Sequence, residues 1–124
     1  MATFSVHLEI GDVTATRFEA VDATIDTGSI FSTVPGDILD RLGVQRTRHE
    51  RFEVASGDVV ENDVGDAIIR VDGKQSASPV IFGKPGEPTL LGAVSLESLL
   101  LGVDPTHQRL IPILGIRDTR LPAP

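Results

Sequence analysis

Alternating polar and apolar residues, interrupted by Gly-Asp and Asp-Gly pairs, restrict the fold of this chain more than any other sequence feature. In residues 3–10 the apolar side chains of Phe4, Val6, Leu8 and Ile10 recur at every second position. A period of two residues is typical of a strand with one buried face, and Gly-Asp pairs favour tight turns. The sequence therefore predicts an all-β fold of strands joined by turns at Gly11-Asp12, Gly57-Asp58 and Asp72-Gly73.

One or two short helices interrupt this pattern. Apolar residues spaced three and four apart predict a helix over residues 35–43, with Gly43 as its C-terminal stop. A second helix of about two turns is expected over residues 93–102, ended by Gly102. Pro112 in the last predicted strand favours an edge or a bulge. The other strands are expected over residues 13–20, 21–26, 50–56, 59–71, 76–83, 89–92 and 108–114.

The length and the aromatic content limit the size and the composition of the core. A chain of 124 residues suffices for one ordinary domain but not for two. We expect that domain over residues 1–116, followed by a frayed tail at residues 117–124. Phe is the only aromatic residue type present, so the core must consist largely of Val, Ile and Leu, which suit strands.

Charge and composition exclude several classes of function. Eighteen acidic against eleven basic residues give a net charge of −7, which disfavours nucleic acid and anionic membranes as partners. The chain has no Cys, which excludes disulfides and thiol chemistry. His7, His49 and His107 are scattered, so we expect no metal site. The start of the chain does not resemble a signal peptide and no apolar run could span a membrane, so we expect a cytoplasmic protein.

The chemistry centres on Asp26, in the stretch ATIDTGSIFSTVP of residues 23–35. Asp-Thr-Gly-Ser alone would be an ordinary polar loop in which Asp caps a turn. Here the quartet lies between apolar runs, which places the carboxylate near a core. A carboxylate in such surroundings needs partners or a shifted pKa.

Residues 21–112 resemble the retropepsin-like aspartic proteases, the single-domain relatives of retroviral proteases, and are most similar to bacterial members. The resemblance rests on TIDTGS around Asp26, on the hairpin ASGD, on the tripeptide Leu90-Leu91-Gly92 before a helix, and on LLLGVDPTHQRLIP at residues 99–112. It implies a closed acid-protease barrel with one or two short helices, a peptide or protein substrate and no cofactor.

Hydrolysis of a peptide bond by two carboxyl groups requires one ionised group, to take a proton from water, and one protonated group, to polarise the carbonyl. The chain offers one Asp-Thr-Gly, because Asp72-Gly73 lacks the Thr and residues 117–120, RDTR, lack the Gly. The second carboxyl must come from another copy. The sequence therefore predicts a homodimeric aspartic endopeptidase in which each subunit contributes Asp26.

The resemblance also implies roles for the neighbours of Asp26. The Thr27 hydroxyl would bond the partner's backbone, including the carbonyl of Ile25. Gly28 would permit close backbone approach, and Ser29 would bond the outer carboxylate oxygen. The tripeptide that would support this loop from beneath, and that read alone would be an ordinary core strand, is Leu90, Leu91 and Gly92.

Residues 52–62 would form a flap that closes over an extended substrate bonded main chain to main chain. No aromatic residue lies near its tip, and the same residues also suit a plain surface hairpin.

An alternative to the enzyme is therefore a catalytically weak or inactive dimeric module that binds peptides or assembles. Cleavage of its own flanks, as one domain of a longer protein, is a weaker possibility. Ser56 and Ser95 lack a nucleophile elbow or a nearby base, so a serine hydrolase is disfavoured. The residues expected at the tip are Ala55, Ser56, Gly57 and Asp58.

Overall fold

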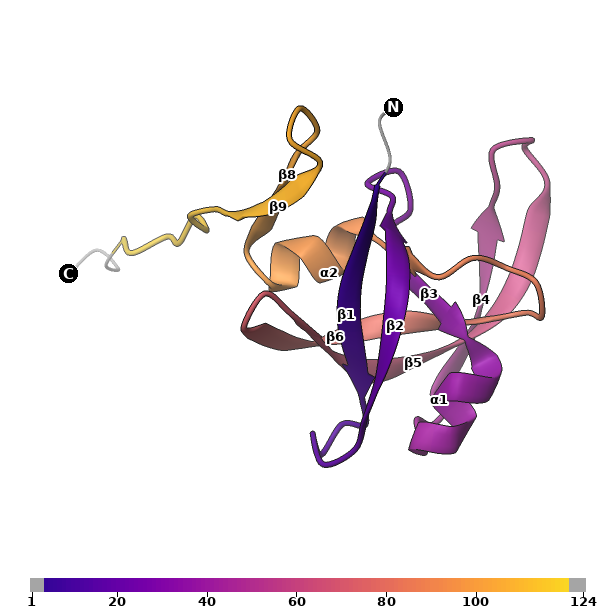
Figure 1. Ribbon diagram of the computed structural model, residues 1–124. Helices are drawn as coiled ribbons and strands as arrows, with labels where there is room; N and C mark the ends of the chain where they lie inside the picture. Colours follow the sequence, from indigo (N-terminus) through magenta and orange to yellow (C-terminus); the bar gives the residue numbers. More distant parts are fainter. Residues whose placement is uncertain (1–3, 121–124) are drawn as a thin grey trace.

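The computed structural model of the chain describes residues 4–120 (Figure 1). Within these residues the chain forms nine strands and two short helices, so the predicted mostly β fold is confirmed. The strands are β1 (Ser5–Gly11), β2 (Phe18–Ile25), β3 (Ser32–Pro35), β4 (Arg48–Glu53), β5 (Val59–Val71), β6 (Lys74–Gly83), β7 (Leu90–Leu91), β8 (Leu101–Asp104) and β9 (Arg109–Pro112), and the helices are α1 (Gly36–Leu42) and α2 (Ala93–Ser98).

Among the described residues, seven strands form one sheet in the order β1-β2-β7-β3-β6-β5-β4, and β8 pairs with β9 in a separate two-stranded sheet. β1 pairs along its length with β2, and its residues Glu9–Gly11 also pair with Ile68–Arg70 of β5. The short strand β7 lies between β2 and β3, parallel to β2 and antiparallel to β3. This insertion brings residues 90–91 beside the end of β2, where Asp26 follows.

The core lies behind the alternating apolar faces of these strands. Phe4, Leu8 and Ile10 are buried, and Val6 packs partly buried against the same core, as the alternation in residues 3–10 predicts. β-branched side chains contribute much of the rest, which suits a pleated and half-buried surface. The largest fully buried side chains on the other elements are Leu39, Ile69, Leu91, Val34, Val64 and Val80.

The region after β1 differs from the prediction. Two strands were expected over residues 13–20 and 21–26, but the chain forms one strand, β2, that begins only at Phe18. The Asp12 carboxylate accounts for the delay, because it accepts hydrogen bonds from the backbone amides of Thr16 at 3.0 Å and Arg17 at 2.9 Å. A hydrogen bond from the Thr14 hydroxyl, followed by that from Arg17, lowers the pKa of Asp12. An Asp-centred turn thus replaces the start of the expected strand.

The first predicted helix is confirmed. α1 begins directly after Pro35 and buries Leu39 and Leu42. Gly43 ends it with a φ of 78°, in the left-handed region, and the amide of Val44 donates to the carbonyl of Leu39 at 3.0 Å. A left-handed glycine followed by such a hydrogen bond is a common way for a helix to end.

The second helix is shorter than predicted, because it ends at Ser98 and not at Gly102. The reversal falls on Leu100, whose φ of 54° lies in the left-handed region. The ammonium group of Lys74 donates to the carbonyls of Leu99 at 3.0 Å and Leu100 at 3.1 Å, which satisfies carbonyls that the helix leaves open. Gly102 consequently lies within β8.

The predicted hairpin turns are present. At Asp72-Gly73 both residues have positive φ, of 51° and 76°, as a tight turn between antiparallel strands requires. At the other hairpin β4 already ends at Glu53 and not at residue 56, and the turn at residues 54–58 has Gly57 at a φ of 89°. Figure 1 shows this hairpin, from β4 to the start of β5, projecting from the body of the molecule.

The C-terminal part of the described chain lies apart from the main sheet. β9 pairs only with β8 within residues 4–120, so Pro112 lies on an edge strand, as predicted. Residues 113–120 follow without regular secondary structure and extend away from the body in Figure 1. No helix within residues 4–120 is long and apolar enough to cross a membrane. The last four residues of the expected tail lie outside the described residues.

Candidate functional site

Asp26 stands at the point where β2 ends and a loop begins. Its backbone amide donates to the carbonyl of Leu91 at 3.0 Å, so the last residue of β7 holds the first residue of the loop. The side chain is neither fully buried nor fully exposed. The carboxylate therefore lies at the margin of the core, where it remains accessible to a ligand.

The loop is organised around this carboxylate. The amide of Gly28 donates to Asp26 Oδ1 at 3.0 Å, and the amide of Ser29 donates to the backbone carbonyl of Asp26 at 3.2 Å. The hydroxyl of Ser29 donates instead to the carbonyl of Phe31 at 2.9 Å, so within one subunit the Gly28 amide bonds the carboxylate and this hydroxyl does not. Thr27 is exposed, and its expected bond across a dimer axis stays a prediction.

The tripeptide Leu90-Leu91-Gly92 lies directly against the loop. Leu90 and Leu91 pair with residues 24–25 of β2, and Leu90 also pairs with Thr33 of β3. At Gly92 a Cβ atom would stand 2.6 Å from the carbonyl carbon and oxygen of Phe31 and 2.8 Å from the carbonyl oxygen of Ser29. Only glycine therefore allows the two backbones to approach this closely.

The start of α2 holds the same loop. The amides of Ala93 and Val94 donate to the carbonyls of Ser29 at 2.8 Å and Ile30 at 3.0 Å. The first amides of a helix have no acceptor within the helix, so here the loop carbonyls serve as their acceptors. The position of α2 and the conformation of the Asp26 loop are thus coupled.

Three serines are buried together beneath the loop, a contact that the sequence analysis did not predict although it named Ser95. The Ser95 hydroxyl lies 2.6 Å from that of Ser32 and 2.6 Å from that of Ser78, and Ser32 accepts a hydrogen bond from the amide of Gly92 at 3.0 Å. All three are almost fully buried. The spacing of Ser95 four residues before buried Leu99 could have placed it on the inner face of α2, but nothing in the sequence pairs it with the other two.

A cleft of about 660 Å³ opens above Asp26. Its floor contains Asp26, Ile30 and Leu90, and its opposite wall contains residues 52–55 of the projecting hairpin. Of the residues expected at the flap tip, Ala55 lines this cleft, whereas the exposed residues 56–58 are not part of its lining.

Phe52 anchors the hairpin above the loop. Its ring meets that of Phe31 edge to face, with 6.0 Å between the ring centroids, an arrangement that aromatic pairs favour. The aromatic residue of this wall, Phe52, therefore lies at the base of the hairpin and not near its tip. The contact joins β4 to the end of the Asp26 loop.

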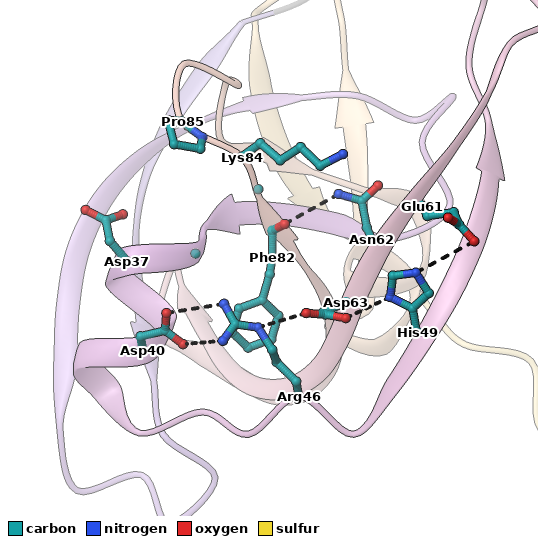
Figure 2. A pocket seen from close by; sticks show the side chains of 12 residues that line it. Asp37, Asp40, Arg46, His49, Glu61, Asn62, Asp63, Phe82, Lys84 and Pro85 are labelled. Atoms are coloured by element: carbon teal, nitrogen blue, oxygen red, sulfur yellow. Dashed lines mark hydrogen bonds and ion pairs between the residues drawn. The ribbon is translucent and has the colours of Figure 1, made fainter.

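A second cavity, of about 410 Å³, lies between α1 and the outer strands and is lined by charged residues (Figure 2). Arg46 bonds the carboxylates of Asp40 at 3.1 Å and Asp63 at 3.0 Å, and its guanidinium lies over the ring of Phe82. His49 bonds the other oxygen of Asp63 at 2.8 Å. Within residues 4–120 no group of three or more His, Asp or Glu side chains is arranged to hold a metal ion. The carboxylates of Asp40 and Asp63 are thus each paired with Arg46 or His49, which indicates a structural role for these groups.

His49 makes the stability of this region depend on pH. The hydrogen bond with Asp63, then the negative charges of Asp63, Glu61 and Glu50, raise the pKa of His49. A raised pKa in the folded state stabilises the fold below the unfolded-state pKa, and this contribution is lost as pH rises through the folded-state pKa. We expect His49→Gln to lower the free energy of unfolding more at pH 5.5 than at pH 9, measured by urea unfolding.

The control for this prediction is the same substitution in an Asp63→Asn background. Without the Asp63 charge, the loss of unfolding free energy caused by His49→Gln should depend less on pH, because the principal partner of the imidazolium is gone. An equal effect of His49→Gln at both pH values in the original chain would contradict the prediction.

Comparison with known proteins identifies the fold. No protein-family model and no curated protein matches the chain. Among solved structures, the simian foamy virus (mac) protease matches with a TM-score of 0.50 and 19% identity, over 73% of this chain and 91% of that one. The EIAV protease, complexed with the inhibitor HBY-793, matches with a TM-score of 0.55 and 21% identity, over 77% and 86% of the two chains. A retropepsin-like aspartic protease from Rickettsia conorii matches with a TM-score of 0.44 and 16% identity, over 78% and 82%.

The likeness to the two viral enzymes extends over about nine tenths of their length. The chain therefore has the fold of the retroviral aspartic proteases, as the resemblance in sequence implies. The closed barrel, the bacterial affinity, the dimer and the roles of single residues remain predictions.

Proposed function

We propose that the chain is a homodimeric aspartic endopeptidase in which Asp26 of each subunit activates the attacking water. The observation that carries this proposal is the placement of the Asp26 carboxylate on the floor of a 660 Å³ cleft. Residues 52–55 of the projecting hairpin also line that cleft, and we infer that this hairpin closes on an extended peptide. The fold of the retroviral proteases supports the same assignment.

The proposed chemistry needs two carboxyl groups with one proton between them. The ionised Asp26 takes a proton from water, while the protonated Asp26 of the second subunit donates to the carbonyl oxygen of the scissile bond. The resulting tetrahedral diol collapses when the carboxyl that took the water proton gives it to the leaving nitrogen. The other carboxylate takes a proton from a diol hydroxyl at the same time, which restores one shared proton to the pair. The Gly28 amide, which donates to Asp26 Oδ1 at 3.0 Å, holds the carboxylate in position in the loop. No covalent intermediate and no cofactor are required.

The proposed architecture is one domain over residues 1–116 with a tail at residues 117–124, acting in the cytoplasm. A closed barrel is supported by the pairing of β1 with both β2 and β5, because the strand pairings then run in a ring from β1 through β2, β7, β3, β6 and β5 back to β1. Under this description β4 lies outside the ring, paired with β5.

The test of the function is cleavage of a mixed peptide library between pH 4 and pH 7. Hydrolysis is expected on the acidic side, because a carboxyl pair that shares one proton is active between its two macroscopic pKa values. Products identified by mass spectrometry would also show the sequence preference. Activity that rises steadily through pH 9 would contradict a carboxyl dyad.

The dimer has its own support in the exposed apolar side chains after β9. Leu114 and Ile116 have relative exposures of 96% and 103%, and Ile113 is also exposed. Water-exposed apolar side chains grouped in one segment mark a surface that associates. We propose that the second subunit covers this segment.

Charge placed on this segment should separate the subunits. We expect the unmodified protein to have a native mass near twice 13.2 kDa. In the double variant Leu114→Asp, Ile116→Asp the dissociation constant of the dimer should rise more than tenfold. Burial of two such side chains contributes about 1.5–3 kcal/mol each. Sedimentation equilibrium with peptide present measures the effect.

The matched control is Val13→Asp, which adds a charge at another exposed apolar residue, in the turn after β1. It should leave the mass unchanged. An unmodified chain that stays monomeric at high micromolar concentration would exclude the proposed dyad.

A second candidate is a dimeric module of the same fold that binds peptides without turnover. It is favoured by the hairpin tip, where Ser56, Gly57 and Asp58 are exposed and lie outside the lining of the cleft. A tip that makes few substrate contacts would clamp a peptide weakly. Peptides that bind an intact dimer and remain uncut between pH 4 and pH 7 would favour this candidate over the enzyme.

A further inference from the structure

The charged groups in the lining of the Asp26 cleft all have the same sign. Apart from Asp26 itself they are Glu53 and Glu87, and no Lys, Arg or His belongs to this lining. Lys84, the nearest basic residue in sequence to Glu87, lines the second cavity instead. Within this lining a bound peptide would therefore meet negative charge only, because Arg48, whose guanidinium lies 5.3 Å from the ring centroid of Phe31, is not part of it.

The two glutamates come from different parts of the chain that meet at the cleft. Glu53 is the last residue of β4, at the base of the hairpin turn, and is exposed. Glu87 lies in the loop between β6 and β7, where its carboxylate accepts a hydrogen bond from the Lys84 amide at 2.8 Å and its own amide donates to the Lys84 carbonyl at 3.0 Å. This turn fixes the Glu87 carboxylate at the rim.

Much of the remaining lining is apolar, although Ser29, Thr33 and Asn62 also belong to it. Ile30, Val54, Val60, Ile81 and Leu90 all contribute to its lining. Such a surface favours apolar side chains of a peptide near the scissile bond, whereas the rim favours a cation. In a dimer each half-site would carry both features.

We propose that the cleft selects extended peptides in which apolar residues are flanked by lysine or arginine. The proposal rests on the proposed function for its catalytic readout, but the charge preference itself applies equally to a binding module. Glu53 and Glu87 are specificity-determining residues under this assignment. The net charge of −7 would add to the attraction by steering cationic peptides towards the protein.

The test uses three peptides with one apolar centre and with flanking residues that are Lys, Gln or Glu. At pH 6 and low salt we expect kcat/KM to fall in that order, with about a tenfold ratio between the Lys and Glu peptides. The ratio should approach one in about 0.5 M salt, because salt screens exposed charges. Equal rates for the three peptides at low salt would overturn the proposal.

Variants locate the effect in the cleft. Glu53→Gln and Glu87→Gln should each lower the ratio between the Lys and Glu peptides, and the double variant should nearly abolish it. Asp72→Asn is the matched control, because it also removes one negative charge. Asp72 lies in the turn beyond the far end of β5, thirteen residues from the hairpin, and Asn tolerates its positive φ. A ratio that falls equally in Asp72→Asn would assign the preference to net charge and overturn the role of the two glutamates.

Fluorescence anisotropy with the Asp26→Asn protein separates this inference from the proposed function. In one outcome the unmodified protein cuts none of the peptides, but the Asp26→Asn protein binds the Lys peptide most tightly and loses this preference when Glu53→Gln and Glu87→Gln are added. The inference then holds and the enzyme assignment fails. If the Gln peptide is cut and the Lys peptide is neither cut faster nor bound more tightly, the enzyme assignment holds and the inference fails.

Discussion

Asp26→Asn is expected to reduce peptide hydrolysis by about 10³-fold or more while the fold and the dimer persist. The substitution removes the group that takes the proton from water in one subunit and the group that polarises the carbonyl in the other. The amide oxygen of Asn can still accept the hydrogen bond from Gly28, now made at 3.0 Å. The free energy of unfolding should therefore change by no more than about 0.5 kcal/mol.

The matched control is Asp22→Asn, on the same strand β2 but exposed and outside the cleft lining. It also replaces one carboxylate by an amide, and hydrolysis should persist. Steady-state assays of both variants, with circular dichroism and sedimentation to confirm fold and dimer, give the comparison. Hydrolysis by a folded Asp26→Asn dimer at the original rate would show that a different group activates the water.

Gly92→Ala is expected to disrupt the candidate site from beneath. The added methyl would stand 2.6 Å from the Phe31 carbonyl and 2.8 Å from the Ser29 carbonyl oxygen, and these are backbone atoms that cannot move aside by changing a rotamer. Either the loop or the start of α2 must shift. We expect the free energy of unfolding to fall by about 1–3 kcal/mol, together with a loss of most hydrolytic activity.

The control for this prediction is Gly73→Asn. Gly73 has a φ of 76°, and a Cβ atom there would meet no other atom within 4 Å. Asn tolerates this backbone conformation, so stability should change by about 0.5 kcal/mol or less. Urea unfolding of both variants measures the difference. A fully stable and active Gly92→Ala protein would contradict the close packing of the two backbones.

The sequence predicted most of the strands and the turns because these depend on local chemistry. The alternation in residues 3–10, the glycine stop at Gly43 and the turn at Asp72-Gly73 each follow from a few neighbouring residues. The late start of β2 also has a local cause, the turn around Asp12, but the early end of α2 does not. The end of α2 depends on the distant cation of Lys74, which bonds the carbonyls of Leu99 and Leu100.

The candidate site shows the same division. The motif at residues 26–29 and the tripeptide at residues 90–92 were identified from the sequence. That Gly92 must lack a side chain, that Ser95 joins two other buried hydroxyls, and that Phe52 anchors the hairpin on Phe31 all depend on contacts between elements. No pattern in one sequence encodes which distant residues meet.

By itself the sequence therefore predicted the strand-rich fold and located the single Asp-Thr-Gly motif, on which the proposal of a second carboxyl from another copy rests. These conclusions depend on side-chain type and spacing along the chain. Only the tertiary structure decided which amide bonds the Asp26 carboxylate, and which two glutamates border the cleft. The physical reason is that β7 pairs with β2 and β3 from 66 and 57 residues away along the chain, and side chains become neighbours in the cleft only after these distant strands have paired.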